Sequence, residues 1–421
     1  MTDTIYGRDA PMPLPSEAPL PAQTGVLIVG GGLTGTSAAL HLAEHGRKVT
    51  LVDMGGIGDG ASGRNGGQLH PGMRRDQVWL AKTMGPKMAD ALWRLGAEAV
   101  ALVHALRVRL QADCGWRPGL IEAAHTEADF DHAKRYAEYL NESRQARHEV
   151  LDRSALSDAI GSSRYCGAIR DPAGGHLNPL ALVNAISSAA HVKGARLHAG
   201  VRAVSQKRTR KGWEVTLEAK AGRHTVIAEE LLLAGNGYMR GLSPFLDARI
   251  LPLRNHILAT APLGKPLIPG GEAVADSRFV VRYFRQDTKG RMVFGGGESY
   301  RRTPRDVARF VRPYLLEVYP QLAAVPVEAA WSGTLGISRL RMPIIRRLEP
   351  GLYVAAGFSG QGVGLGTFAG KVVADAIAGE GSRLEVLSRV PAPPFPGGPL
   401  FKTQLGYLAM MWYSARDHLG F

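Results

Sequence analysis

VLIVGGGLTGTSAALHLAEHGRKVTLVD, residues 26–53, is the segment from which the architecture of this chain can be inferred. Residues 26–29 form a short continuous apolar run, typical of a strand buried on both faces in a parallel sheet. Residues 34–45 carry small and apolar side chains at helical spacing and stop at Gly46, a suitable helix end. A second strand is expected at residues 49–52. Strand, helix and strand within about 30 residues predict one right-handed βαβ unit.

The turn between this strand and this helix has the pattern G-x-G-x-x-G, formed by Gly30, Gly32 and Gly35. Gly30 permits the tight turn, Gly32 lets the backbone approach a pyrophosphate, and Gly35 lets the helix pack closely on the strand. Free N–H groups at the helix N-terminus favour negative charge there. Asp53 ends the next strand, where an acid is expected to accept hydrogen bonds from a ribose. The motif in this context predicts a dinucleotide site.

A second glycine-rich segment, GASGRNGGQ at residues 60–68, follows closely. Its glycines, together with Ser62, Arg64 and Asn65, favour neither a helix nor a strand. We expect a loop of exposed amides and donors, suited to phosphate, ribityl hydroxyls and the polar edge of a ring. A flexible surface loop is the alternative.

Composition limits the classes of protein to consider. The 421 residues suit two interlocked domains, and the 52 glycines suit turns and close approaches of backbone to a ligand. The net charge of +14 suits an anionic substrate, nucleic acid or an acidic membrane surface, although a merely basic protein would show it too. Cys114 and Cys166 are too few for a disulfide framework or a four-thiolate metal site, so no metal is expected. A cytoplasmic protein is expected, because no secretory signal or membrane-spanning segment is evident.

Other segments follow helical or strand-like patterns. Helices are expected at residues 77–110, 126–150, 304–318 and 367–378. Strands are expected at residues 195–198, 213–217, 225–228, 231–234 and 352–356, with a hairpin turn at 206–212. Residues 250–300 suggest an antiparallel sheet with one open face. Residues 1–24 suggest an extended arm, because their prolines and acidic residues leave no helical or strand-like pattern of apolar residues.

With these motifs the chain resembles the FAD-dependent amine and amino-acid oxidoreductases of the D-amino-acid oxidase type, and within them the gamma-glutamylputrescine oxidase branch. The resemblance extends over almost the whole chain. Beyond residues 28–53 and 60–68 it rests on GGHLNPLALVNA (174–185), LLLAGNGY (231–238), RYFRQDTKGRMVFGGG (282–297), AWSGTLGIS (330–338), GFSGQGV (357–363), PPFPGG and LAMMWYSARD.

The resemblance implies an α/β fold with a Rossmann-type FAD-binding domain and an interleaved, mostly antiparallel substrate domain. The FAD-binding domain is placed at residues 25–76, 151–238 and 329–385, and the substrate domain at 77–150 and 239–328. Residues 386–421 would add a proline-rich segment and a C-terminal amphipathic helix.

By the same resemblance, FAD is the cofactor. Its ADP half would be held by Gly30, Gly32, Gly35 and Asp53, with Val201 meeting the adenine. The ribityl chain and the flavin would be held by Ala61, Ser62, Asn65, Gly66, Gly67 and Gln68. The isoalloxazine would be bordered by Gly333, Gly357, Ser359, Gly360, Gln361, Gly362 and Val363. The remaining cofactor-binding positions are Leu33, Thr34, Met54, Arg64 and Gly235.

Two positions depart from the family pattern. Gln361 stands where the family often has His, and Leu340 stands where it often has an acid. A Gln cannot take up a proton as a His can, which removes proton transfer from that position. Some relatives attach flavin through a cysteine in the C-terminal third, but both cysteines here precede residue 170. We therefore expect non-covalent FAD.

Residues for the substrate are less clearly marked. Arg285 or Arg339 could bind a carboxylate through two hydrogen bonds, and Tyr283 or Trp331 could wall the flavin face. Each is equally a solvated arginine or a packed aromatic side chain, and His70 and His256 are more often bystanders. The predicted catalytic set is Tyr283, Arg285, Trp331 and Gln361.

The predicted reaction is oxidation of a C–N bond in an amine or amino acid, with hydride passing to flavin N5 and hydrolysis of the imine. Oxygen or a quinone-type carrier would reoxidise the flavin, and no nucleic acid is expected as a partner. The alternatives are a pyridine-nucleotide dehydrogenase, a tRNA-modifying flavoprotein and a non-catalytic flavin-binding module.

The C-terminal segment, residues 400–421, has an apolar stripe at helical spacing from about residue 401 to 417. Such a helix can dock on the body of the protein or lie on a membrane surface. Few basic residues flank the stripe, so docking with Trp412 buried is favoured over membrane binding.

Overall fold

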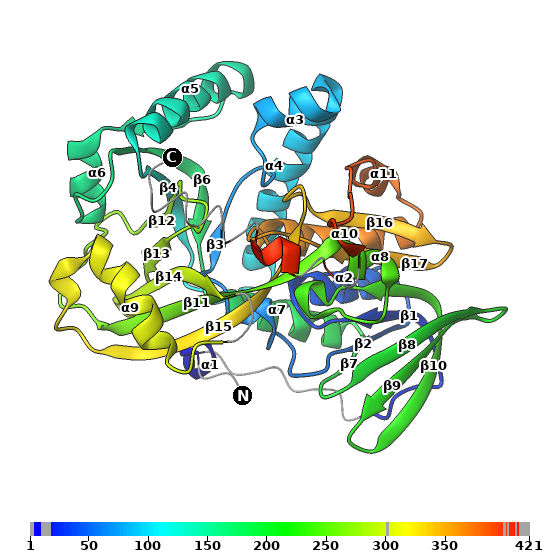
Figure 1. Cartoon of the computed structure of the whole chain (residues 1–421). Helices are drawn as coiled ribbons and strands as arrows, with labels where there is room; N and C mark the ends of the chain where they lie inside the picture. The colour runs from blue at the N-terminus through cyan, green and yellow to red at the C-terminus, as the bar shows by residue number, and fades with distance from the viewer. Residues whose placement is uncertain are drawn as a thin grey trace.

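The chain builds two β-sheets with helices packed between and around them (Figure 1). The computed structural model describes residues 4–9, 18–299, 303–398, 401, 404–408 and 411. The first sheet has eight strands, the second has nine, and the second is mostly antiparallel. The fold is therefore mixed α/β, as the sequence predicts.

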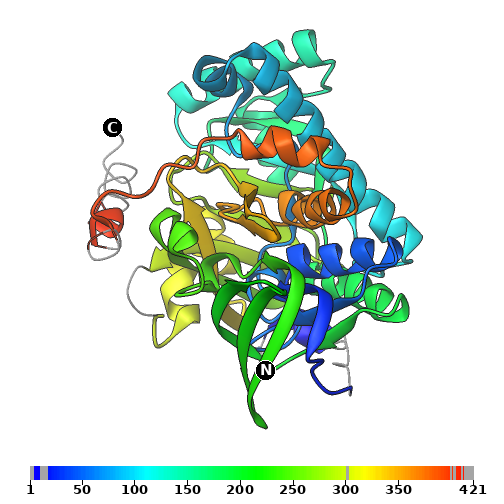
Figure 2. The ribbon, with the colours of Figure 1, turned by 90° about the vertical axis from the view of Figure 1, so that its right-hand side faces the viewer.

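The first sheet contains the predicted βαβ unit. The order along it is β16 (Ile344–Glu349), β17 (Leu352–Ala356), β10 (Gly222–Leu233), β1 (Gln23–Val29), β2 (Val49–Val52) and β7 (Arg196–His198). A hairpin of β8 (Arg202–Thr209) and β9 (Gly212–Ala219) extends from β10 at the edge of this sheet (Figure 2). Strands β10, β1, β2 and β7 are parallel, so their carboxyl ends meet at one edge.

The second sheet forms one wall of the cavity described below. Its order is β15 (Val327–Ser338), β11 (Ile250–Pro262), β14 (Arg291–Ser299), β13 (Tyr283–Gln286), β12 (Ala273–Asp276), β4 (Arg117–Ala124), β6 (Gly167–His176) and β3 (Gln68–Leu69), while β5 (Glu149–Leu151) pairs with β6.

Helices join and cover the sheets. The described helices are α1 (Ile5–Asp9), α2 (Leu33–Glu44), α3 (Gln77–Met84), α4 (Pro86–Arg109), α5 (Glu127–Arg144), α6 (Arg153–Ile160), α7 (Pro179–Val192), α8 (Pro244–Arg249), α9 (Val307–Val318), α10 (Gly364–Ile377) and α11 (Ser382–Ser388). Short 3₁₀ turns are η1 (Ala61–Gly63), η2 (Asn236–Tyr238) and η3 (Pro320–Leu322).

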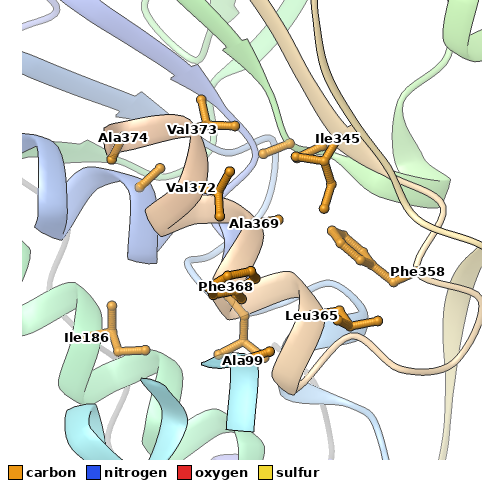
Figure 3. Close-up of a cluster of buried hydrophobic side chains, with 14 of the residues drawn as sticks. Ala99, Ile186, Ile345, Phe358, Leu365, Phe368, Ala369, Val372, Val373 and Ala374 are labelled. Atoms are coloured by element: carbon orange, nitrogen blue, oxygen red, sulfur yellow. The ribbon is translucent and has the colours of Figure 1, made fainter. Parts of the chain in front are cut away.

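The largest core cluster lies where α10 packs on α2, α4 and the first sheet. Figure 3 shows Phe368 and Val372 of α10 near Ala99 of α4 and Ile186 of α7, all buried. Gly370 makes this packing possible, because a Cβ there would lie 2.2 Å from the Thr34 carbonyl oxygen of α2. The N-terminal part of α2 therefore packs directly against the middle of α10.

Several expectations about local structure were wrong. Residues 1–24 are not an extended arm throughout, because α1 forms with Ile5 and Tyr6 buried against the second sheet. The helix expected over 77–110 is broken at Gly85, whose φ of 85° is left-handed. The helix expected at 126–150 ends at Arg144, and β5 follows it.

The remaining corrections concern strands. The predicted hairpin turn is present but shorter, since residues 206–209 belong to β8 and only residues 210 and 211 form the turn to β9. The two strands expected between 225 and 234 are one, β10. The second sheet has no open face along β14, where residues 291–297 are all buried. Helix α9 covers one face, and α1 and α7 contribute to the other. The alternation of polar and apolar residues along the strands could not predict that α9, α1 and α7 cover the sheet.

The division into domains stays a prediction. The first sheet draws its strands from residues 23–52, 196–233 and 344–356, within or next to the ranges predicted for FAD binding. Strands β6 and β15 lie in the second sheet, although the predicted boundaries place most of their residues with the first. In the C-terminal segment, residues 404–408 are helical, while Trp412 lies outside the described residues.

Candidate active site

The glycine-rich turn after β1 has the close contacts that the motif requires. Gly30 has a φ of 116°, and a Cβ there would lie 2.7 Å from the Ala234 carbonyl carbon. A Cβ on Gly35 would lie 1.8 Å from the Gly30 carbonyl oxygen. Ser62 closes the turn from the other side, since its Oγ accepts a hydrogen bond from the Leu33 N–H at 2.9 Å. Only glycine fits at positions 30 and 35, so backbone atoms form the surface of the site at this turn.

Asp53 braces this turn from the end of β2. Its Oδ2 accepts from the Gly31 N–H at 2.7 Å, and its Oδ1 accepts from the Gly55 N–H at 2.8 Å. Burial raises the pKa of Asp53, although these two hydrogen bonds oppose the shift. Its backbone carbonyl accepts from Val201 N–H at 2.8 Å, which brings Val201 to the same edge of the sheet.

A cavity of about 1330 Å³ begins at this edge and continues to the second sheet. Many residues from the predicted cofactor set line it: Gly30, Gly32, Leu33, Thr34, Asp53, Met54, Ala61, Ser62, Arg64, Asn65, Gly66, Gln68, Val201, Gly235, Gly333, Ser359, Gly360, Gln361, Gly362 and Val363. Segments far apart in the chain thus meet around one space. Gly35, Gly67 and Gly357 lie behind its wall instead.

The segment at residues 60–68 is held by its own side chains and is not a loose surface loop. The Asn65 Oδ1 accepts from the Gly67 N–H at 2.7 Å, and its Nδ2 donates to the Ala61 and Ser62 carbonyls. Gly67 has a φ of 75°, and a Cβ there would lie 1.9 Å from the Leu177 carbonyl oxygen. The turn therefore presents a fixed set of backbone groups to the cavity.

Arg285 and Trp331, two residues of the predicted catalytic set, support this segment from behind. Arg285 is buried, and its Nε donates to the Gly66 carbonyl at 2.6 Å. Trp331 is also buried, and its Nε1 donates to the Arg64 carbonyl at 2.8 Å. Neither side chain lines the cavity. The structure therefore gives both a part in holding the loop.

The other two members of the set reach the cavity. Tyr283 lines it, and its hydroxyl donates to Oδ1 of Asn255. Its ring passes so close to Gly66 that a Cβ there would lie 2.6 Å from a ring carbon. Gln361 lines the cavity from the turn before α10, and among the described residues its buried Oε1 has no hydrogen-bond donor.

Of the three remaining candidate residues for the substrate, one lines the cavity and two do not. His70 lines the cavity, and burial lowers its pKa to about 4, with a further contribution from Arg74. His256 lies behind the wall between the Ser332 and Ser299 hydroxyls, at 2.7 and 2.9 Å. Arg339 is exposed at the surface, and its Nη1 donates to the Pro394 carbonyl at 3.3 Å.

Charged residues that the sequence analysis missed line the half of the cavity near the second sheet. They include Arg74, Glu122, Asp171, Glu298 and Arg341. One signal was available, because Glu122 is the single charge within the apolar run GLIEAA of β4. Arg74, in a polar connecting segment, carried no such signal.

The residues present fit FAD. Sites for one small ligand usually measure about 300–1,000 Å³, so this cavity has room for a dinucleotide and a second molecule. The N-terminus of α2 faces one end of it, where backbone N–H groups favour a pyrophosphate. Gln361 adds a polar group without a protein partner among the described residues at the other end.

Comparison with known proteins identifies the family. Residues 25–376 match the model of the family described as DAO, FAD dependent oxidoreductase. The chain belongs to the DAO family. It is an FAD-dependent oxidoreductase, which confirms the predictions of fold, cofactor and enzyme class made from the sequence.

Relatives of this DAO-family chain extend over nearly all of it. A probable oxidoreductase OrdL from Rhizobium meliloti is 38% identical over 93% of this chain and 92% of its own length. The gamma-glutamylputrescine oxidoreductase of Escherichia coli is 33% identical over 94% and 93%. The structure of glycine oxidase from Geobacillus kaustophilus superposes with a TM-score of 0.71 at 22% identity, covering 85% of this chain and 95% of that one.

Within the described ranges, none of the helices combines the length and the apolar character needed to cross a bilayer.

Proposed function

We propose that this chain oxidises a C–N bond of a small amine or amino acid. The observation that carries the proposal is the single cavity that joins the glycine-rich turn at Gly30 and Asp53 to the charged wall at the second sheet. Such a cavity suits a cofactor at one end and a small polar molecule at the other. The names of the relatives, gamma-glutamylputrescine oxidoreductase and glycine oxidase, support an amine or amino acid as that molecule.

The chain's own residues would hold FAD in two parts. The turn from Gly30 to Thr34, with Asp53, Met54 and Val201, would take the ADP half. Residues 61–68 and 359–363, with Gly235 and Gly333, would take the ribityl chain and the flavin. When bound, FAD supplies an acceptor for two electrons and a hydride.

His70 is a neutral group within reach of a bound molecule. Its pKa of about 4 leaves it uncharged at pH 7. Its Nε2 lies 3.1 Å from the Gln68 Oε1, while the Gln68 Nε2 donates to the Val274 carbonyl at 2.8 Å. The Gln68 oxygen therefore accepts from His70 Nε2, which leaves the Nδ1 lone pair to accept an N–H of the substrate.

The proposed reaction needs no charged base. The carbon next to nitrogen loses a hydride with its electron pair, the nitrogen lone pair forms the C=N bond, and the nitrogen loses a proton to water. Water then adds to the carbon, and the C–N bond breaks to give a carbonyl compound and the released amine or ammonia. Oxygen or a quinone-type carrier takes the two electrons.

The products test this proposal. The holoenzyme is incubated with a panel of amines and amino acids in air or with a soluble quinone, and the carbonyl product is trapped with a hydrazine. We expect one carbonyl for each two electrons transferred. Transfer of electrons from NADH or NADPH with no carbonyl from any amine would contradict the proposal and support the dehydrogenase alternative.

Acid precipitation tests the mode of attachment. We propose that FAD is bound without a covalent bond, so the yellow colour should remain in the supernatant. Colour in the pellet would show attachment through another residue.

A further inference from the structure

The part of the cavity near the second sheet carries charges of both signs. Arg74 lies on the segment between β3 and α3, and Glu122 lies in the middle of β4. Both line the cavity. Charges enclosed by protein are normally paired with an opposite charge, so Arg74 and Glu122 are each expected to have a partner.

Arg74 is held at one nitrogen only. Its Nε donates to the Ser359 carbonyl at 3.3 Å, which places it beside the turn at residues 359–363. Among the described residues, neither of its terminal nitrogens has a hydrogen bond or an ion pair. Burial and the nearby Arg341 lower the pKa of Arg74 to about 10, so it remains charged at pH 7. A carboxylate would satisfy the two free nitrogens together.

Glu122 presents a carboxylate to the same space. Its neighbours Ile121 and Ala123 point into the opposite core, so Glu122 points to the cavity face of β4. Its side chain is exposed to the cavity, and it makes no hydrogen bond or ion pair with any other described residue. Desolvation by the surrounding protein and the negative charge of Asp171 raise the pKa of Glu122, while the charge of Arg74 opposes the shift. A bound cation would offset both effects.

The other charges around Glu122 already have partners. Asp171 Oδ2 lies 3.4 Å from the His148 Nε2, and its Oδ1 accepts from the Ala173 N–H at 2.9 Å. Glu298 and Arg341 also have interactions within the protein. Arg74 and Glu122 are therefore two opposite charges that line the cavity with bonding capacity left over.

We propose that the cavity selects an amine that carries both a carboxylate, bound by Arg74, and a separate cationic group, bound by Glu122. This inference rests on the proposed function, because it concerns the substrate of the same site. Arg74 lies beside residues 359–363, so the carboxylate end lies toward the predicted flavin position, and the cation points toward β4.

Three compounds of matched length separate the two contacts. Lysine carries the carboxylate and the distal ammonium, norleucine lacks the ammonium, and 1,5-diaminopentane lacks the carboxylate. Racemic amino acids are used. Each compound is mixed rapidly with the anaerobic holoenzyme, and the dissociation constant is read from the change in the flavin spectrum that precedes any bleaching. The variants are Arg74→Met and Glu122→Gln, with Arg153→Met and Glu127→Gln, an exposed pair outside the cavity, as controls.

Lysine should bind at least ten times more tightly than either analogue. Arg74→Met should weaken lysine and norleucine about tenfold or more and leave diaminopentane unchanged, and Glu122→Gln should weaken lysine and diaminopentane but not norleucine. The control variants should change nothing. Equal affinities for the three compounds, or equal losses in both cavity variants, would overturn the proposal and indicate that Arg74 and Glu122 only balance each other.

Binding and oxidation can fail separately. If the binding pattern appears but no amine yields a carbonyl product, the charged site stands and the proposed function is wrong. If amines are oxidised without any dependence on Arg74 or Glu122, the function stands and the charged site is wrong.

Discussion

The Tyr6 hydroxyl donates a hydrogen bond to the Asn65 backbone carbonyl at 2.9 Å, which ties the N-terminal helix α1 to the loop predicted to hold the flavin. The same hydroxyl accepts from the Arg285 Nη2 at 3.2 Å, and the Tyr6 ring meets Trp331 edge to face at 5.5 Å. Residues near the start of the chain therefore support the far side of the cavity wall.

Tyr6→Phe should weaken FAD binding several-fold, because the loop loses a partly buried hydrogen bond worth about 0.5–1.5 kcal/mol. The dissociation constant for FAD, measured by refilling the apoprotein, checks this. Tyr319→Phe is the matched control, since its hydroxyl donates to the Ile160 carbonyl at 2.8 Å away from the cavity. Equal effects of the two variants on FAD affinity would contradict a special role for Tyr6.

Asp53→Ala should lower FAD affinity about ten- to a hundredfold, since hydrogen bonds to a charged acceptor are worth about 1.5–3 kcal/mol. The backbone N–H groups of Gly31 and Gly55, which donate hydrogen bonds to the Asp53 carboxylate, would also lose their acceptor. Flavin occupancy after dialysis measures the effect. Asp152→Ala is the control. It also removes a carboxylate that accepts a hydrogen bond from a backbone N–H, that of Ala155 at the start of α6, and it should leave flavin occupancy unchanged. Full occupancy in Asp53→Ala would remove this residue from the site.

Glu317→Gln should destabilise the protein at pH 7 but not in acid. Burial alone would raise the pKa of Glu317, but the hydrogen bonds and charges of Arg282, Arg164 and Arg278 outweigh it and lower the pKa to about 2. Because the folded-state pKa lies below the unfolded value, the stabilisation is complete above about pH 4.5 and disappears toward pH 2.

The expected loss at neutral pH is about 1–2 kcal/mol, reduced from the full shift because the Glu317 side chain is 35% exposed. Denaturant unfolding of both proteins at pH 7, 4.5 and 3 measures it. A difference that stays constant down to pH 3 would show that charge is not the cause.

Deleting residues 400–421 should lower the melting temperature. Gly406 packs so closely that a Cβ there would lie 2.8 Å from Leu251, and the Tyr407 hydroxyl donates to the Pro252 carbonyl at 3.4 Å. Phe401, Leu405, Leu408 and Met411 are nevertheless exposed. A truncated protein that keeps its stability but no longer sediments with anionic liposomes would favour the membrane interpretation instead.

Local sequence was enough to predict the tight glycine-rich turn after β1. Gly30, Gly35 and Asp53 act within one βαβ unit, and backbone sterics fix what each can be. The strand Val49–Val52 also has its predicted bounds, and all four of its residues are buried.

The charged lining of the cavity near the second sheet could not be predicted in this way. Arg285 resembled a carboxylate ligand, but β13 directs it behind the wall to the Gly66 carbonyl. Glu122 became part of the cavity because β4 pairs with β12 and β6, which come much later in the chain. Which face of such a strand meets the cavity depends on tertiary pairing. The only indication of this in the sequence of β4 is the charged Glu122 within its apolar part.

The central claim, that this DAO-family chain oxidises amines, is tested most directly by mixing the oxygen-free holoenzyme with lysine and the other amines of the panel. We predict that the visible absorption of the flavin is bleached by at least one amine, and that admitting oxygen or a quinone restores it. A flavin that chemical or photochemical reduction bleaches normally, but that no amine or amino acid bleaches, would contradict the account.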